Sequence, residues 1–239
     1  PTAFYLGRFV REIRKAIFID GTASSYNKIA PKYKTRGYAI KAGIKTRKNA
    51  LLLSYASAFD DENSLIYFNP KYNITPRKSK TIGGEILLTL FQNVIYHFNA
   101  GASIYTRNVN GIHLDSILRN SGEKELPKWT GKIEKSPNLT TQVMYAHDHL
   151  LSFASEVFNL NLRYKYIQPE YKALGLAHIN TDLSQWSIEP GFKLLGKKLN
   201  LNLVLGKQAN NLNQKLITKN NNTIFNLLAT YIPNDRLSA

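Results

Sequence analysis

The chain has 239 residues, contains no cysteine and carries a formal charge of +16 at pH 7. The absence of cysteine excludes disulfide bonds, thiolate metal sites and a cysteine nucleophile. No apolar run approaches the roughly 18 residues that a membrane-spanning helix needs, which excludes a helical membrane protein. Residues 1–80 hold 16 Lys and Arg against 5 Asp and Glu. Such an excess predicts contact with a polyanion: nucleic acid, anionic lipid headgroups or acidic glycans.

The first part of the chain mixes strand and loop signals. Residues 2–17 combine aromatic and aliphatic residues with a basic run and are predicted as a strand, although a helical stripe also fits them. Residues 18–32 carry Gly, Ser, Asn and Pro and are predicted as a loop. Because the sequence opens with Pro1 and shows neither an initiator Met nor a signal peptide, we expect a mature product or a piece of a longer protein.

The rest of the chain alternates apolar and polar residues with a period of two, which is typical of strands with two different faces. The clearest example is a hairpin from Gln185 to Gln208, in which Leu199, Leu201 and Leu203 alternate with polar residues. Strands are predicted at residues 37–45, 51–59, 82–90, 94–104, 139–145, 151–166, 185–194, 199–206 and 225–231. With the first segment this makes about ten strands and no helix longer than three turns.

Two irregularities are predicted in this series. His147, Asp148 and His149 are expected to form a tight turn after the strand at 139–145. In the strand that follows, the apolar residues change phase between Val157 and Phe158, which predicts a β-bulge.

The connections alternate strictly in length. Long loops are predicted near residues 18–32, 60–78, 108–137, 168–182 and 210–222, and short turns near 45–49, 92–93, 147–149 and 196–198. In an up-and-down meander, this order puts every long loop at one end and every short turn at the other. The pattern predicts one domain over residues 1–239 with an all-β fold: an antiparallel, up-and-down transmembrane β-barrel of about ten strands.

A transmembrane barrel turns apolar residues to lipid and polar residues to an aqueous lumen, with aromatic residues at the membrane interfaces. Charged or amide groups in mid-strand predict the lumen-facing residues Lys41, Glu85, His97, Asn99, Arg163 and Glu189. Large aromatic residues toward strand ends predict the aromatic girdle Tyr96, Tyr105, Tyr164, Tyr166, Trp186 and Tyr231.

A soluble antiparallel sandwich or barrel also alternates and keeps one wet face. Its connections need not sort by length, however, and Greek-key links would break the order of long and short. The loop order therefore favours the membrane barrel. Ten strands could close as a narrow barrel or form an arc of a wider one.

Several segments resemble the repeating strand and loop pattern of large outer-membrane β-barrel proteins of the Bacteroidota. The resemblance lies in residues 168–175, Asp182, the hairpin at 185–208, residues 208–212 and 231–233, and in the looser matches at 33–38, 70–73 and 102–106. It implies a bacterial outer-membrane location, contact with the lipid bilayer and lipopolysaccharide, and a complex with other outer-membrane proteins or lipoproteins. Members often carry a periplasmic domain and further strands, so both interpretations of this chain stay open, a whole barrel and a fragment of a larger one. No catalytic residues come with the resemblance.

Two clusters have residue types that suit metals or catalysis. His147, Asp148 and His149 suit zinc, but no third ligand follows nearby, so a solvated turn without metal is favoured. The acidic run from Asp60 to Glu62 lacks the spacing of a calcium loop and is predicted as a charged loop tip. Some ten-stranded barrels are proteases with acidic pairs and a histidine at the rim. Here the two clusters are predicted at opposite ends, out of hydrogen-bond reach, so we expect neither an enzyme nor a cofactor.

The leading functional prediction is an integral outer-membrane barrel that acts as a channel or as a structural subunit of a surface transport, secretion or assembly complex. The alternative is a soluble, basic, β-rich nucleic-acid-binding protein. That class interleaves aromatic residues with Lys and Arg on one exposed face. Here Tyr164 and Tyr166 share the aliphatic face while Arg163 and Lys165 oppose them, so we expect no nucleic-acid partner.

Overall fold

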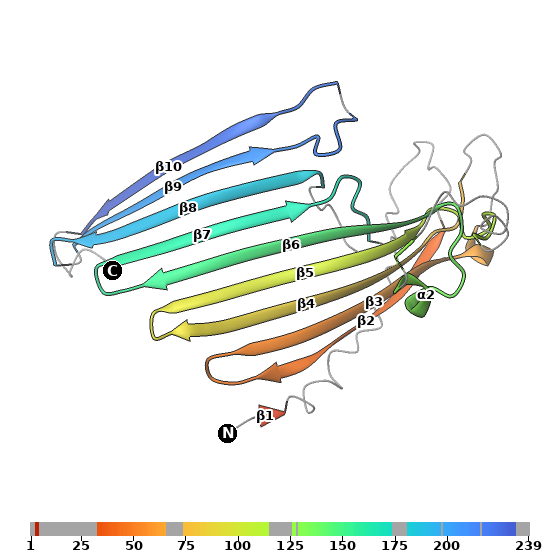
Figure 1. Ribbon diagram of the computed structural model, residues 1–239, viewed down its shortest axis with the longest axis horizontal. Helices are drawn as coiled ribbons and strands as arrows, with labels where there is room; N and C mark the ends of the chain where they lie inside the picture. Colours follow the sequence, from red (N-terminus) through yellow and green to blue (C-terminus); the bar gives the residue numbers. More distant parts are fainter. Residues whose placement is uncertain are drawn as a thin grey trace, which may run out of the picture.

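The computed structural model is dominated by one antiparallel sheet of nine long strands and one two-residue strand (Figure 1). It describes residues 3–4, 33–65, 74–114, 126–127, 129–173, 181–196, 198–215 and 217–232. The strands are β1 (Ala3–Phe4), β2 (Lys34–Lys45), β3 (Ala50–Asp61), β4 (Lys78–Phe91), β5 (Val94–Thr106), β6 (Thr141–Ala154), β7 (Phe158–Ile167), β8 (Leu183–Leu194), β9 (Leu199–Ala209) and β10 (Asn221–Tyr231).

Every strand pairs antiparallel with the next strand in the chain, so the spatial order is simply β1 to β10. This confirms the predicted all-β, up-and-down arrangement. Helix is almost absent: within the described ranges there are only the 3-10 turn η2 (Glu62–Ser64) and the four-residue helix α2 (Thr130–Ile133). Neither is long and apolar enough to cross a membrane.

The connections lie as the alternation of loop lengths predicts. In Figure 1 the hairpin turns β2–β3, β4–β5, β6–β7 and β8–β9 are at one end of the sheet, and the longer connections are at the other. We call these the short-turn end and the long-loop end. The sheet is open in the described part of the chain, because β10 pairs only with β9, and β2 pairs with β3 and with the two residues of β1. A closed barrel of ten strands is therefore not what the structure contains.

The predicted turn at His147–His149 and the predicted bulge are both wrong. Strand β6 runs unbroken through His147, Asp148 and His149, and the chain turns later, between Ala154 and Phe158. Ser155 closes this turn, because its N–H donates to the Phe158 carbonyl at 2.8 Å and its Oγ accepts from Phe158 N–H at 3.1 Å. The apparent phase change is the passage from one strand to the next. Of the usual turn residues Gly, Pro, Asn, Asp and Ser, this turn contains only Ser155.

Residues that lie opposite one another in a ladder share a face, so the register divides the sheet into two faces. The apolar face carries Tyr38, Ile40, Leu51, Leu53, Ile82, Ile86, Tyr96, Phe98, Leu151, Leu160, Leu162, Ile188, Phe192, Leu201, Leu205, Phe225 and Leu227. The polar face carries Lys41, Ser54, Glu85, His97, Asn99, Asp148, Asn161, Arg163, Lys165, Gln185, Glu189, Asn202 and Asn226, together with some aliphatic residues.

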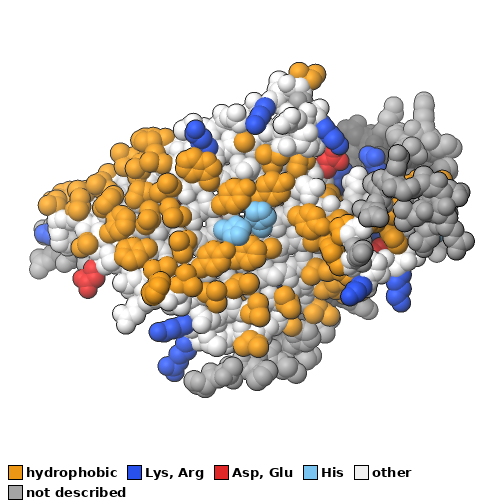
Figure 2. All heavy atoms as spheres, viewed as in Figure 1, with side chains coloured by type: hydrophobic (Ala, Val, Ile, Leu, Met, Phe, Trp, Pro, Cys, Tyr) orange, Lys and Arg blue, Asp and Glu red, His pale blue; other side chains and the backbone are white. Residues whose placement is uncertain are grey.

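Much of the apolar face is not covered by protein. Side chains in mid-strand are widely exposed, for example Leu53 at 60% and Phe225 at 68%. Figure 2 looks onto this face, where apolar side chains cover most of the strands and a pair of histidines lies among them. In the described residues, large exposed apolar side chains outnumber the buried ones.

The largest buried apolar cluster lies on the polar face, toward the long-loop end. Tyr105, Met144, Ile167, Tyr171 and Leu183 pack together there. Tyr171 comes from the β7–β8 connection, which folds over the sheet, and the next residue of that connection accepts a hydrogen bond from the Ser103 hydroxyl at 2.6 Å. The core therefore holds a long connection against the sheet and does not join two layers.

Glycine is distributed unequally between the faces. Six of the seven glycines in strands β2 to β9 lie on the polar face, and Gly84 is the exception. A Cβ on Gly43 would overlap the Leu51 carbonyl oxygen, and one on Gly206 would lie 2.5 Å from the Trp186 carbonyl oxygen. Strand glycines commonly mark a bend or a close backbone approach. The crowding indicates that the sheet is concave on its polar face.

Candidate functional site

The centre of the polar face carries a charged network with side chains from three strands, β2, β4 and β5. Lys41 of β2 donates to Glu85 Oε2 of β4 at 2.7 Å, so the two side chains meet across β3. The other carboxylate oxygen lies 3.2 Å from His97 Nε2 of β5, and Asn99 Nδ2 lies 3.3 Å from the same nitrogen. The predicted residues Lys41, Glu85, His97 and Asn99 are thus brought into one network.

A second polar group lies beside the first, on β6, β7 and β8. Arg163 binds Asp148 through two nitrogens, with Nε 3.0 Å from Oδ1 and Nη2 2.5 Å from Oδ2. Farther along the face, Ser187 Oγ donates to Glu189 Oε1 at 2.8 Å. Lys165 lies opposite Asp148 in the ladder but makes no ion pair with a described residue. All six residues predicted to face a lumen therefore share the polar face.

A hollow of about 290 Å³ opens on the polar face between these groups. Its lining includes Lys41, Ser54, Glu85, Asn99, Asp148, Lys165 and Tyr171, and His147 also borders it. The sequence pattern did not predict that Ser54, Asp148, Lys165 and Tyr171 would share one site. For Asp148 the signal was present: once β6 continues through 147–149, alternation puts Asp148 on the polar face and its two histidine neighbours on the other.

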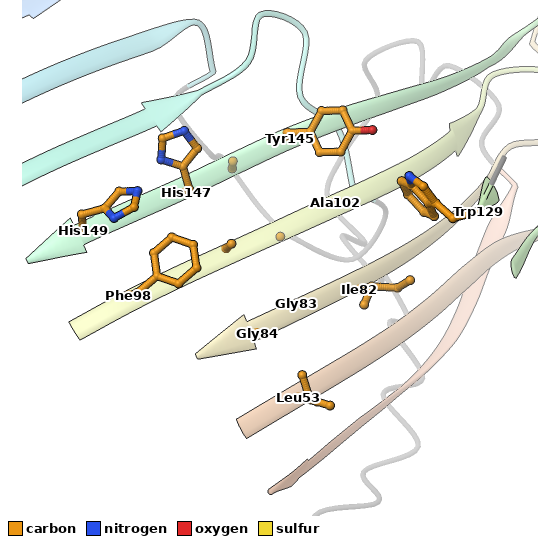
Figure 3. Close-up of a pocket in the computed structure, with 13 residues that line it drawn as sticks. Leu53, Ile82, Gly83, Gly84, Phe98, Ala102, Trp129, Tyr145, His147 and His149 are labelled. Atoms are coloured by element: carbon orange, nitrogen blue, oxygen red, sulfur yellow. The ribbon is translucent and has the colours of Figure 1, made fainter. Parts of the chain in front are cut away.

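The apolar face has a hollow of its own, of about 490 Å³, in the same part of the sheet (Figure 3). Small residues at Gly84, Ala100 and Ala102 leave the space, and larger apolar and aromatic side chains surround it. Trp129, which directly precedes α2, lines it from the side of the long loop, and His147 and His149 line it from β6.

The two histidines belong to this apolar surface and not to a turn. Their rings lie 5.0 Å apart, centroid to centroid, and His149 Nδ1 lies 2.7 Å from the Tyr96 hydroxyl. His147 Nδ1 is buried and has no hydrogen-bond partner among the described residues. Asp148 points to the opposite face, so the three residues cannot share an ion. In the described part of the chain, no group of three or more His, Asp or Glu side chains is close enough to hold a metal.

Five of the six predicted girdle residues lie on the apolar face: Tyr96, Tyr164, Tyr166, Trp186 and Tyr231. Tyr105 does not. It lies on the polar face, only 7% exposed, in the cluster with Met144 and Tyr171. Tyr105 was assigned to the girdle because it lies near a strand end. Odd and even positions along a strand lie on opposite faces, and this was not taken into account for Tyr105.

At the long-loop end, the segment around α2 is held over the apolar face by charge. Glu134 lies 2.8 Å from Lys78 Nζ and 3.3 Å from Lys80 Nζ, and Lys80 also donates to the Ile133 carbonyl at 2.7 Å. Burial raises the pKa of Glu134, but the hydrogen bonds from Lys78 and Ser136 N–H and the two ammonium charges hold it below its usual range. The carboxylate is therefore a charged anchor for this segment.

The acidic run at the end of β3 is part of the long-loop structure. Asp60 is buried and accepts hydrogen bonds from Thr35 Oγ1 at 2.6 Å and Arg77 Nε at 2.9 Å. Leu53 shares a cross-strand row with His147, and Asp60 is seven residues farther along β3, about 23 Å at the usual rise per residue. Asp60 and the histidines also lie on opposite faces. They do not form an acid-base pair.

No protein-family model, curated protein or solved structure matches this chain.

Proposed function

We propose that the chain forms a section of the wall of a transmembrane β-barrel, with its apolar face toward lipid and its polar face along an aqueous lumen that passes hydrophilic solutes. The observation that carries this proposal is the wide, uncovered apolar face. Soluble monomers rarely expose contiguous apolar patches larger than a few hundred Å², and larger ones mark membrane or protein contacts.

The polar face supports the same proposal. Its mid-strand charges lie among Gly, Ser and Asn residues and are paired across strands, as in the Lys41–Glu85 and Arg163–Asp148 ion pairs. Polar groups of this kind fit a water-filled interior, where they remain solvated on one side. The crowded glycines on this face agree with a sheet that curves toward the lumen.

The open sheet supports an arc of a wider barrel. In the described residues β10 pairs only with β9, and the other edge strand, β1, is described over two residues that pair antiparallel with β2, so the sheet ends without closing. The two sides of the sheet also differ: β2 carries Lys34, Arg36 and Lys41 outside its two-residue pairing with β1, whereas β10 has no charged residue and no proline. Charges protect sheet edges from pairing, so the β10 edge is the one suited to accept a further antiparallel strand.

The membrane proposed is a bacterial outer membrane, and this part rests on the sequence resemblance alone. The same resemblance supports a role in a larger surface complex for transport, secretion or assembly. A nucleic-acid-binding function is less well supported, because base stacking needs aromatic residues among the exposed cations. The described aromatic residues of mid-strand lie on the apolar face, opposite Arg163 and Lys165.

Spin labels at single cysteines test the proposal directly, because the native chain has no cysteine. Leu201→Cys and Leu227→Cys report on the apolar face, and their chain neighbours Asn202→Cys and Asn226→Cys report on the polar face. In phospholipid vesicles we expect the two leucine positions to collide mainly with oxygen, which concentrates in lipid. The two asparagine positions should collide mainly with a water-soluble nickel chelate.

Each neighbouring pair is its own control, because strand, depth and label are nearly the same and only the face differs. The proposal is rejected if the water-soluble chelate reaches the leucine positions as readily as the asparagine positions. It is also rejected if the labelled protein stays monodisperse in buffer without lipid or detergent.

A further inference from the structure

The hollow on the polar face has more positively than negatively charged side chains in or beside it. Three cations lie in or beside it, Lys41, Arg163 and Lys165, against two anions, Glu85 and Asp148. The anions are already engaged. Glu85 accepts from Lys41 and lies within reach of His97, and Asp148 takes both nitrogens of the Arg163 fork.

Lys165 is the cation that remains. It lines the hollow and is partly buried, and its ammonium group has no hydrogen bond or ion pair with any residue that the structure describes. Its cross-strand neighbours are Asp148, which is held by Arg163, and the neutral Gln185. A lysine ammonium has three donors and no acceptor, so what it lacks is an anionic or carbonyl oxygen.

Two neutral donors line the same space. The hydroxyls of Ser54 and Tyr171 make no hydrogen bond with the residues described, and both line the hollow. Gly83 and Gly101 leave the room between them. A Cβ at Gly83 would lie 2.6 Å from Ser54 Oγ, and one at Gly101 would lie 3.5 Å from the Tyr171 hydroxyl. The hollow, at about 290 Å³, is at the small end of the usual range for ligand sites.

We propose that this hollow binds a small oxyanion, the carboxylate or phosphate group of a hydrophilic solute, with Lys165 as its charged partner and Ser54 and Tyr171 as neutral donors. The proposal rests on the proposed function to the extent that a water-filled lumen must lead to the site. It assigns this wall a preference for anionic solutes at one position along the lumen.

The test is an isothermal titration calorimetry experiment. The detergent-solubilised full chain is titrated with inorganic phosphate and, separately, with acetate. Lys165→Gln should weaken binding about 10- to 100-fold, which corresponds to the loss of one charge-assisted hydrogen bond. Lys165→Arg keeps the charge and should retain most of the affinity. Lys193→Gln is the matched control, because Lys193 lies on the same face near the short-turn end and does not line the hollow.

The second measurement separates this inference from the proposed function. Wild-type protein and the three variants are placed in planar bilayers, and the reversal potential is recorded in a potassium chloride gradient. Of the three variants, only Lys165→Gln should shift the reversal potential away from the value that anion preference gives. Phosphate binding that depends on Lys165 in a protein without conductance would reject the channel and keep the oxyanion site. Undetectable binding of both anions, or equal binding by wild type and Lys165→Gln, overturns the site whatever the conductance.

Discussion

The two faces of this sheet differ in how their side chains are held, although they share one backbone. On the polar face, strands are tied by ion pairs such as Lys41–Glu85, which crosses β3, and Arg163–Asp148, and by the β7–β8 connection, whose Tyr171 packs on the sheet. On the apolar face, side chains such as Leu162 and Ile188 lie opposite each other in the ladder and are exposed. The difference indicates that the polar face specifies which groups meet; under the proposed function, the apolar face only needs a surrounding medium without water.

The largest effect is expected when one charge is placed on each face at neighbouring positions, because this tests directly whether the two faces meet different media. Leu162→Arg puts a guanidinium in the middle of the apolar face, where a lipid contact would cost about 2–4 kcal/mol near the bilayer midplane. Asn161→Arg puts the same group on the polar face, where we expect less than about 1 kcal/mol. Urea unfolding from phospholipid vesicles measures both free energies.

The two variants introduce the same side chain and charge at adjacent residues of β7, so the incoming residue does not separate them. Equal destabilisation by both would contradict the assignment of the faces to lipid and water. A larger effect at Asn161 would reverse it.

A smaller effect is expected where the apolar face is covered by protein, around α2. Glu134→Gln removes the anion that Lys78 and Lys80 share, and should weaken the docking of this segment by about 1.5–3 kcal/mol. Because the folded pKa of Glu134 is below its usual value, docking is fully favoured above the unfolded pKa of about 4.3 and is lost as the pH falls through the lower, folded pKa.

Trp129 reports this docking. The chain has two tryptophans, so Trp186→Phe leaves Trp129 as the sole indole, and its emission should shift to longer wavelength at acid pH. Glu134→Gln should show that shift already at neutral pH, whereas Glu62→Gln, an exposed residue at the same end of the sheet, should behave as wild type. An acid shift that survives unchanged in Glu134→Gln would assign it to another group.

Much of the fold follows from alternation and from the order of the connections. The hairpin at 185–208 was predicted almost residue for residue, because both of its strands alternate cleanly and a glycine marks the turn. The residues predicted to face a lumen share the polar face for the same reason: parity within a correctly placed strand fixes the face of Glu85 or Arg163 before any contact is known.

The failures have a common physical cause. His147–Asp148–His149 was predicted as a turn because three polar residues in succession suggest solvent, yet β6 runs through them and carries polar groups on both of its faces. Lys41 and Glu85 are 44 residues apart, and their contact requires the register of two hairpins and side chains long enough to cross β3. Neither the register nor the depth of the hollow beside them can be derived from periodicity alone.

The smallest expected effects compare the curvature of the two faces. Gly43→Ala adds a methyl group that would overlap the Leu51 carbonyl oxygen and lie 2.6 Å from Leu52 Cα, so we expect a loss of about 1–3 kcal/mol. Gly84→Ala adds the same group to the apolar face, where the nearest atom, Leu53 Cδ2, is 3.8 Å away, and should change stability by no more than about 0.5 kcal/mol. Both are measured by urea unfolding from vesicles.

Because the two substitutions have the same effect on the unfolded chain, a difference between them reports crowding in the folded sheet. If Gly84→Ala were the more damaging variant, the concave side would have to be the apolar one, and the lumen could not lie against the polar face.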